Sequence, residues 1–282
     1  MSIMAISQTL GSLGDEIGRE LARTLSYELA DREIILKAAD RFGGGVRGLE
    51  HVTDEKPSLW ERFAETERRY RAYIEAIVWD LAARDKVVLL GRGAPFILRR
   101  VRHCVRVRIT ASERLRATRV EHQQGFTADA AERIVRQSDR ERGARIRFLY
   151  HVDWDDPLLY DLVVNTDRLG VKEAARVAQE ALRNERFQPS PDSLGEVRDL
   201  SLTAQAQATL LADPRAALLL HPVTRQLQVS VTCKDGHVTL AGTVVGEELR
   251  GIAEEIVGKL PGVTGVRSEI VIVQPARPTY PV

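Results

Sequence analysis

Short apolar runs alternate with longer stretches of helical periodicity along the first 186 residues. The runs that predict buried strands are residues 3–7, 87–91, 104–109 and 161–165. The periodic stretches that predict helices are 58–84, 111–122, 127–148 and 170–185, with a further helix after the first strand, where Ile17, Leu21 and Leu25 recur every four residues. Buried strands that alternate with helices predict an α/β fold with a parallel sheet.

A different pattern follows residues 187–199, a stretch with Pro, Ser and Gly that we interpret as a linker. A helix at about 201–212 precedes two alternating apolar runs, and Asp235-Gly236 between those runs predicts a hairpin. A helix at about 246–259 and a strand at 266–273 complete an αββαβ order. We therefore predict domains at 1–186 and 200–274, a linker at 187–199, and a disordered tail at 275–282.

Composition narrows the classes of protein without naming one. The 282 residues suit about two domains, and 44% hydrophobic residues allow a sizeable core. Forty-one basic and 40 acidic residues give a net charge of +1, which argues against binding nucleic acid through bulk charge. Only six of the basic residues are lysine, which a GC-rich genome explains, although some chemistry needs a lysine at one place.

Location and redox state follow from what the sequence lacks. Cys104 and Cys233 form neither a disulfide framework nor a CxxC motif, so a metal cluster and a secreted scaffold are not expected. The first residues lack a basic segment followed by a long apolar run, so no signal peptide is expected. No apolar run approaches the roughly 20 residues of a membrane span, and the expected location is cytoplasmic.

The first chemical motif is a glycine turn between the first strand and the first helix. Gly11, Ser12, Gly14 and Gly18 lie there. Such a turn lets backbone N–H groups converge at a helix N-terminus, where an anion is stabilised. The GxxxxGK[ST] pattern is absent because no lysine precedes Lys37, and the acidic Asp15 begins the helix. Phosphate binding and a merely tight strand-to-helix turn both remain open.

Further segments give the chain a family resemblance over about residues 1–185. It resembles the cytidylate kinase-like family in the order and spacing of AISQTLGSLGDEIGRELARTLSYELADREII (5–35), VVLLGRGAPFIL (87–98), VRVRITASERLRATRV (105–120), AERIVRQSDRERGAR (131–145) and YDLVVNTDRLGVKEA (160–174). The resemblance implies a P-loop kinase fold with a mobile lid. It also implies transfer of the γ-phosphoryl group of ATP to a nucleoside monophosphate, with Mg²⁺.

The resemblance also implies roles for individual residues. Asp31 resembles an aspartate at the monophosphate site, and Arg92 resembles the arginine that grips the acceptor phosphate. The lid segment provides Asp139 toward the acceptor, and Arg140 and Arg142 as arginines that neutralise the transferring phosphate. Convergent arginines suit this reaction, in which catalysis is mostly positioning and charge stabilisation. No metal-ligating residue is assigned.

Each of these residues has a structural interpretation as well. Asp31 has the position of an N-cap for a following helix, and both roles can coexist. Arg92 follows a buried strand, where α/β ligand sites lie, but it can also be a surface arginine. The dense charge of 127–148 is typical of a solvated helix face, and Arg140 and Arg142 do not share a face unless the helix breaks. Residues 154–157 predict a turn, for which contact with the ligand is the less favoured alternative, and the glycine run 43–45 predicts a loop able to close over the acceptor.

The chain departs from the family in its loop. The lysine and the Ser/Thr metal ligand of true cytidylate kinases are missing, and relatives with a degenerate GSGGREIG loop have a basic residue where this chain has Asp15. Two hypotheses follow. One is a nucleoside monophosphate kinase for CMP or dCMP; the other is a pseudokinase that acts as a nucleotide sensor or adaptor.

Residues 200–274 resemble a BON domain, through LQVSVTCKDGHVTLAGTVVGEELRGIAEEI and PGVTGVRSEIVIV. BON domains are associated with phospholipid surfaces or protein contacts. The block has no nucleophile, base or metal cluster, so we expect a binding or regulatory role. The alternative is a passive domain that packs on the kinase region or dimerises it.

Overall fold

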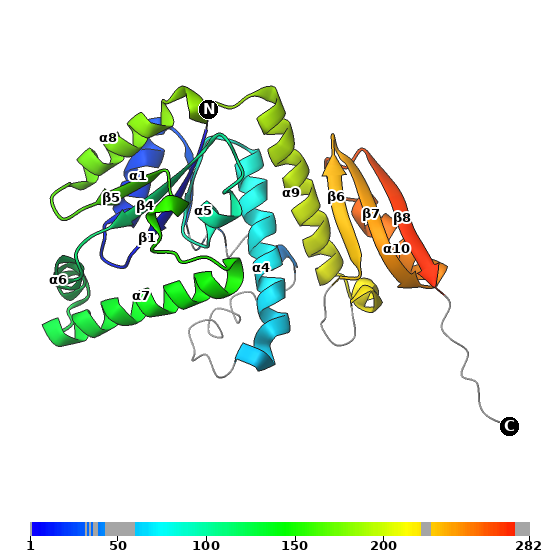
Figure 1. Cartoon of the computed structure of the whole chain (residues 1–282), viewed down its shortest axis with the longest axis horizontal. Helices are drawn as coiled ribbons and strands as arrows, with labels where there is room; N and C mark the ends of the chain where they lie inside the picture. Colours follow the sequence, from blue (N-terminus) through cyan, green and yellow to red (C-terminus); the bar gives the residue numbers. More distant parts are fainter. Residues whose placement is uncertain are drawn as a thin grey trace. The chain divides into compact units, whose positions relative to one another are not determined.

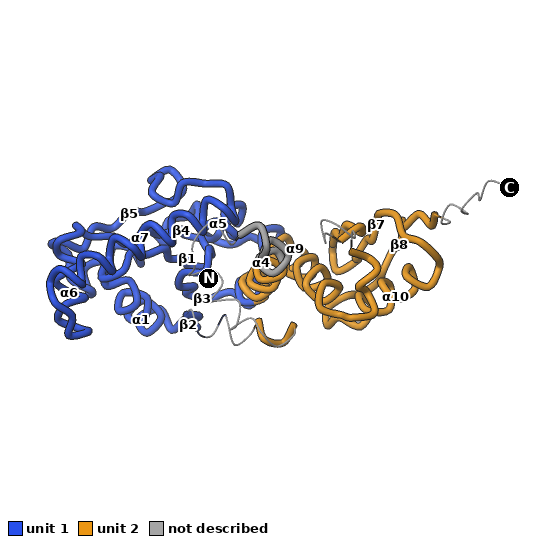
Figure 2. Tube along the Cα trace, turned by 90° about the horizontal axis from the view of Figure 1, so that it is seen from below, with its two compact units in different colours: residues 1–38, 50–55, 81–194 blue, residues 39–49, 56–80, 195–282 orange. Residues whose placement is uncertain are grey.

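The computed structural model describes residues 2–31, 33, 35, 39–42, 60–220 and 227–273, with side chains in the helix that starts at residue 60 described from residue 69 onward. The chain divides into two compact units (Figure 2). The first comprises residues 1–38, 50–55 and 81–194, and the second comprises 39–49, 56–80 and 195–282. The domain boundary near residue 190 stays a prediction.

The first unit is built on a five-stranded parallel sheet, which confirms the predicted α/β class. The strand order is β2-β3-β1-β4-β5, with β1 at Ile3–Gln8, β2 at Glu28–Ala30, β3 at Val87–Leu90, β4 at Cys104–Thr110 and β5 at Leu162–Asn165. The four apolar runs became β1, β3, β4 and β5. Strand β2 was not predicted, because three residues are too short to show a pattern.

Helices cover both faces of this sheet (Figure 1). Helices α1 (Gly14–Leu25) and α8 (Val171–Leu182) pack on one face, against a core that includes Met4, Ile6 and Val107. Because side chains alternate along a strand, Ser7 and Arg108 face the other side. That side carries α5 (Ala94–Ile97) and α7 (Ala128–Tyr150), and α6 (Glu113–Gln124) leads into α7.

The second unit contains a three-stranded mixed sheet in the order β6-β7-β8. Its elements are α4 (Trp60–Ala83, to residue 80 in this unit), α9 (Pro191–Ala212), a 3-10 helix at Pro214–Leu219, β6 (Val229–Lys234), β7 (His237–Val245), α10 (Glu247–Gly258) and β8 (Gly265–Val273). The predicted hairpin is confirmed, and both of its turn residues have positive φ, Asp235 at 52° and Gly236 at 78°. The αββαβ order is confirmed as well.

The clearest correction concerns α9. The helix expected from about residue 201 begins at Pro191, within the stretch interpreted as a linker, because Pro is well tolerated in the first turn of a helix. The glycine run 43–45 and the tail 275–282 lie outside the described residues. Among the described helices, none has the length and apolar character needed to cross a membrane.

Candidate nucleotide site

The predicted glycine turn links β1 to α1 at the carboxyl end of the sheet. Gly11 has φ 77°, and a Cβ there would lie 2.7 Å from the carbonyl oxygen of Arg116, so only glycine fits. Leu13 is left-handed, at φ 65°, and is the N-cap of α1. No side chain caps this helix, so its first N–H groups are available to an anion.

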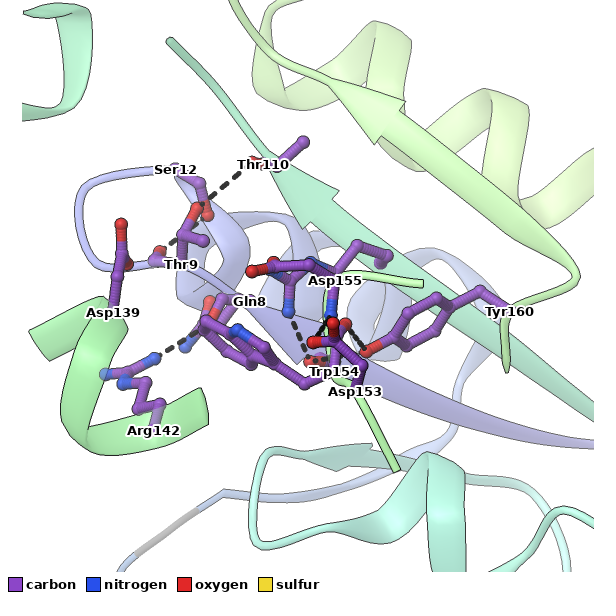
Figure 3. A network of polar contacts seen from close by, with 12 residues as sticks. Gln8, Thr9, Ser12, Thr110, Asp139, Arg142, Asp153, Trp154, Asp155 and Tyr160 are labelled. Carbon is purple, nitrogen blue, oxygen red and sulfur yellow. Dashed lines mark hydrogen bonds and ion pairs between the residues drawn. The ribbon is translucent and has the colours of Figure 1, made fainter. Parts of the chain in front are cut away.

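Ser12 points toward β4 (Figure 3). It is fully buried, and its hydroxyl donates to the carbonyls of Thr9 at 2.7 Å and Ile109 at 3.2 Å. Its backbone N–H also donates to Thr9, at 3.2 Å. Ser12 therefore holds the turn to β4, and the exposed donors belong to the residues after it.

Aligning the start of α1 with the end of GxxxxGK[ST] shows what replaces the motif. Gln8 and Leu13 stand at the two glycine positions, Gly14 at the lysine, and Asp15 at the Ser/Thr. A Cβ on Gly14 would lie 1.8 Å from Oε1 of Gln8, so the Gln8 side chain fills space beside the helix start. Its amide nitrogen donates to Asp15 Oδ1 at 2.7 Å.

Two arginines of α6 bind the turn from behind. Arg116, which is buried, donates to the carbonyl of Leu10 at 3.4 Å and of Ala111 at 3.0 Å. Arg119 donates to the carbonyl of Gly11 at 3.1 Å and to that of Thr166 at 2.8 Å. The guanidinium groups of both arginines therefore donate to carbonyl oxygens of the turn, and these hydrogen bonds hold the turn in place. These two residues were not singled out from the sequence; the R-x-x-R spacing, which puts both on one face of a helix, could have indicated them.

The predicted lid residues lie on α7, and they separate. Asp139 makes a two-point ion pair with Arg116, at 3.0 and 2.7 Å. Arg142 donates to the carbonyl oxygen of Gln8 at 2.7 Å (Figure 3). Helix α7 runs unbroken through this segment, so Arg140 and Arg142 point about 160° apart, and Arg140 is exposed. The structure thus brings Asp139 and Arg142 to the turn, but not Arg140.

Arg92 and Asp31 follow the carboxyl ends of β3 and β2, at the sheet edge where the turn lies. Arg92 is left-handed, at φ 50°, between Gly91 at 73° and Gly93 at 76°. A non-glycine residue in this region is strained, which is common at functional sites. The carbonyl of Asp31 accepts from the N–H of Ile35 at 3.1 Å, as an N-cap carbonyl does.

One buried arginine was missed. Arg108 of β4 is 5% exposed and donates to Asp155 Oδ1 at 2.6 Å, and its guanidinium lies over the rings of Trp154 and Tyr160. Figure 3 shows Asp155, Trp154 and Tyr160 together. Burial raises the pKa of Tyr160, whose hydroxyl donates to the carbonyl of Trp154 at 2.7 Å. We treated 104–109 as an apolar run, although charges at alternate positions of a buried strand signal partners on one face. Residues 154–157 do form the expected turn and 3-10 start.

Mg²⁺ can be tested against these residues. Ser12 does not offer its hydroxyl, since it donates to backbone carbonyls. Asp15 fits better, because it is exposed at the first turn of α1 and uses one oxygen for Gln8. Mg²⁺ commonly binds one or two carboxylates together with phosphate oxygens and water. In the described part of the chain, no group of three or more His, Cys, Asp or Glu residues is arranged to hold a metal without a substrate.

Comparison with known proteins agrees with this geometry. A family model described as "Cytidylate kinase-like family" matches residues 3–168, which is more than half of the chain. The chain belongs to the cytidylate kinase-like family. Its relatives include proteins named cytidylate kinase from Pyrobaculum calidifontis, 27% identical over 179 residues, and Pyrobaculum neutrophilum, 28% identical over 178 residues; each match covers 63% of this chain and 91% of the relative.

The fold and the second unit have matches of their own. The crystal structure of an uncharacterized protein from Eubacterium ventriosum superposes with a TM-score of 0.54 at 17% identity, covering 66% of this chain and all of that one. This likeness concerns the fold of the family region. A BON domain model matches residues 201–274. The chain therefore combines a cytidylate kinase-like region with a C-terminal segment that is similar to BON domains.

Proposed function

We propose that the protein is a nucleoside monophosphate kinase that uses ATP, with CMP or dCMP as acceptor. The observation that carries the proposal is the meeting of Arg142 with the uncapped start of α1 at the carboxyl end of β1. Arg142 bonds to the Gln8 carbonyl, and the Gln8 side chain bonds to Asp15 in the first turn of α1, so a guanidinium and the helix-start N–H groups belong to the same turn, a combination that suits a phosphate chain. Family membership supports the reaction class, and the name of the relatives supports cytosine as the base.

The reaction is an in-line transfer. An oxygen of the acceptor's phosphate forms a bond to the γ-phosphorus of ATP, the bond to the β–γ bridging oxygen breaks, and ADP leaves with that electron pair. The N–H groups after Ser12, at Leu13, Gly14 and the start of α1, hold the donor phosphates. Arg142 offsets the charge on the moving group. Asp31 and Arg92 hold the acceptor, and Asp139 acts through Arg116.

Mg²⁺ supplies charge neutralisation between the phosphate oxygens when it is bound. In this chain Asp15 is the residue that would hold it. Without the ion, the Asp15 carboxylate would repel a phosphate at the helix start. With the ion bound, the Asp15 carboxylate would contact the ion, and the repulsion of the phosphate would be offset. The absence of the Ser/Thr ligand is therefore compatible with a kinase that binds its nucleotide only as the magnesium complex.

The test is ADP formation by the full chain with ATP, Mg²⁺ and each nucleoside monophosphate in turn. We expect turnover that is fastest with CMP or dCMP and is reduced by Arg92→Ala mainly through the KM of the acceptor. Turnover that is equal for all acceptors would remove the cytosine assignment. No turnover with any acceptor would remove the kinase proposal itself.

A second function is favoured by one observation. Gln8 fills the space beside Gly14, where the motif has its lysine, and its side chain binds Asp15 in the first turn of α1. A chain that has replaced all four defined loop positions suits a pseudokinase, which binds a nucleotide as a sensor or adaptor. Nucleotide binding by calorimetry, without phosphoryl transfer, would support this second function over the first.

For the BON domain we propose a binding role toward a phospholipid surface or a protein. The support is the family match over 201–274 and the complete αββαβ unit. Flotation of the full chain with anionic and with neutral liposomes tests the lipid role, with a chain ending at residue 190 as the control. Failure of the full chain to float with either lipid would leave a protein contact or a passive packing role.

A further inference from the structure

Arg108 lies on β4, an inner strand of the sheet, where a buried arginine is unusual. It pairs in register with Ser7 of β1 and Val163 of β5, and its side chain is 6% exposed. Its guanidinium donates to Asp155 at 2.6 Å and to the Ser7 hydroxyl at 3.2 Å. A charge this buried is costly unless it is paired and hydrogen-bonded, so these contacts are required for it to remain there.

The partner carboxylate comes from outside the sheet. Asp155 belongs to the turn that follows α7, and its side chain is 68% exposed. The neighbouring Trp154 is buried, and its ring lies 3.8 Å from the guanidinium carbon of Arg108. A stacked guanidinium is attracted by the ring as well as by the carboxylate. Arg108 therefore binds the turn through two different side chains.

Trp154 also packs against α7. A Cβ added to Gly143 of α7 would lie 3.3 Å from Nε1 of Trp154, so the small residue is what lets the indole approach. Ile146 of α7 belongs to the same buried cluster as Trp154, with Tyr150 packed against it. The indole is thus a support on which this part of α7 rests.

The residues that Arg108 contacts lead in both directions to the glycine turn and the α7 residue bound to it. Ser7 is followed by Gln8, whose carbonyl accepts from Arg142, and Arg142 immediately precedes Gly143. One chain of contacts therefore runs from β1 through Arg108 and Trp154 to α7. The Arg142–Gln8 bond closes it (Figure 3).

We propose that Arg108 is a positioning residue, which fixes Asp155 and Trp154 to the sheet and thereby holds α7 so that Arg142 stays at the glycine turn. The part played by Arg142 in phosphoryl transfer rests on the proposed function, but the placement of α7 does not. Lysine would keep the charge and lose the planar stack and the two-directional bonding, so it is a partial replacement only.

Arg106 provides a matched control on the same strand and the same face. It makes a two-point ion pair with Asp161, at 3.0 and 2.7 Å, and the Arg106 side chain is 22% exposed, so it is less buried than Arg108. None of its described contacts involves Trp154 or α7. Arg106→Met therefore removes an ion pair of β4 without touching the support of the lid.

The first arm uses no catalysis. In a Trp60→Phe/Trp79→Phe background, Trp154 is the only tryptophan. Arg108→Met is expected to shift its emission and to raise its quenching by acrylamide, and to speed hydrogen exchange in 143–156 by about tenfold or more. Arg106→Met is expected to leave both unchanged. Equal exchange in the two variants, or no change in either, would overturn the proposal.

The second arm is kinetic. Arg108→Met is expected to lower kcat about tenfold while the KM values of both substrates stay within about twofold, because the misplaced group acts only in the transition state. Asp155→Asn and Arg108→Lys are expected to give intermediate losses. A rise in the KM of the monophosphate with kcat unchanged would instead make Arg108 a ligand-binding residue. An inactive wild-type chain would remove the kinase function, and the first arm would still decide the positioning role.

Discussion

The side-chain amide of Gln8 donates a 2.7 Å hydrogen bond to the carboxylate of Asp15, from the last residue of β1 to the first turn of α1. The two residues stand at the first glycine and at the Ser/Thr of the GxxxxGK[ST] pattern. Gly14, at the lysine position, has no side chain and leaves room for this bond. The departures from the motif are therefore coupled: each makes space or supplies a partner for another.

This coupling predicts how the loop can be rebuilt. Gln8→Gly together with Gly14→Lys removes the obstruction and restores the lysine. We expect about tenfold or greater tightening of Mg-ATP binding, since a charge-assisted hydrogen bond contributes about 1.5–3 kcal/mol. Isothermal titration calorimetry measures it.

The control is Gly14→Lys alone. Its new Cβ would meet Gln8 at 1.8 Å, so we expect a lower melting temperature and no gain in affinity. A double variant that binds no better than the wild type would show that the donor phosphates do not lie at this turn.

The sequence predicted more of the fold than of the candidate site. Strands β1, β3, β4 and β5 are apolar runs bounded by breaks, and the Asp235-Gly236 turn fixed the second sheet, because these signals are local. Strand β2 and helix α5 have three and four residues, which is too short for a hydrophobic pattern to predict them. Helix α9 begins earlier than the sequence pattern predicts, at Pro191, because a proline near a helix can either end it or occupy its first turn, and here it occupies the first turn.

The site depends on pairings across long separations in the chain. Arg108 and Asp155 are 47 residues apart, and Arg142 and Gln8 are 134 apart. No periodicity links such residues, so the sequence could name Arg142 only by resemblance and gave no reason to choose Arg108. Ser12 was assigned by its place in a glycine turn, and only its buried hydroxyl bonds show that it supports the turn.

The hairpin of the second unit gives a pH-dependent prediction. Burial, and then the hydrogen bond to Asp199, raise the pKa of the Cys233 thiol to about 11. Alkylation of Cys233 in a Cys104→Ser chain should therefore increase steeply only near pH 11. The unfolded thiol ionises first, so this group also makes the fold lose stability as the pH rises from about 9 toward 11.

Asp199→Asn provides the comparison. The loss of its charge should lower the pKa of Cys233 and speed alkylation at pH 8 by about tenfold for each unit of the decrease. A wild-type profile with its midpoint near pH 9, or a profile that Asp199→Asn does not move, would contradict the prediction.

The pair of Asp139 and Arg116 predicts a stability effect. Asp139→Asn leaves a guanidinium that is 7% exposed without its carboxylate, while Arg116 keeps two backbone carbonyls as acceptors. We expect unfolding free energy to fall by about 2 kcal/mol, below the usual loss for a fully buried pair because Asp139 is 28% exposed. Urea unfolding followed by Trp154 fluorescence, in the single-tryptophan background, measures the first unit.

Glu132→Gln is the matched control for that measurement. Glu132 lies on the same helix and pairs with Arg136 at 3.5 Å, but both side chains are about half exposed. Exposed pairs contribute about 0–1 kcal/mol, so the change should be under about 0.5 kcal/mol. Equal losses in the two variants would mean that the Arg116 pair does not fix α7 to the turn.

Arg142 is the cation that α7 brings to the turn, and its removal gives the last prediction. If its guanidinium offsets charge on the transferring group, Arg142→Ala should lower kcat by about 100-fold or more, as the loss of one preorganised donor does in other enzymes. Arg142→Lys should recover part of that loss, because it keeps the charge. Arg136→Ala, on the same helix but paired with Glu113, should change kcat by less than about twofold. Steady-state kinetics with CMP measure all three, and equal effects of Arg142→Ala and Arg136→Ala would place the catalytic charge elsewhere.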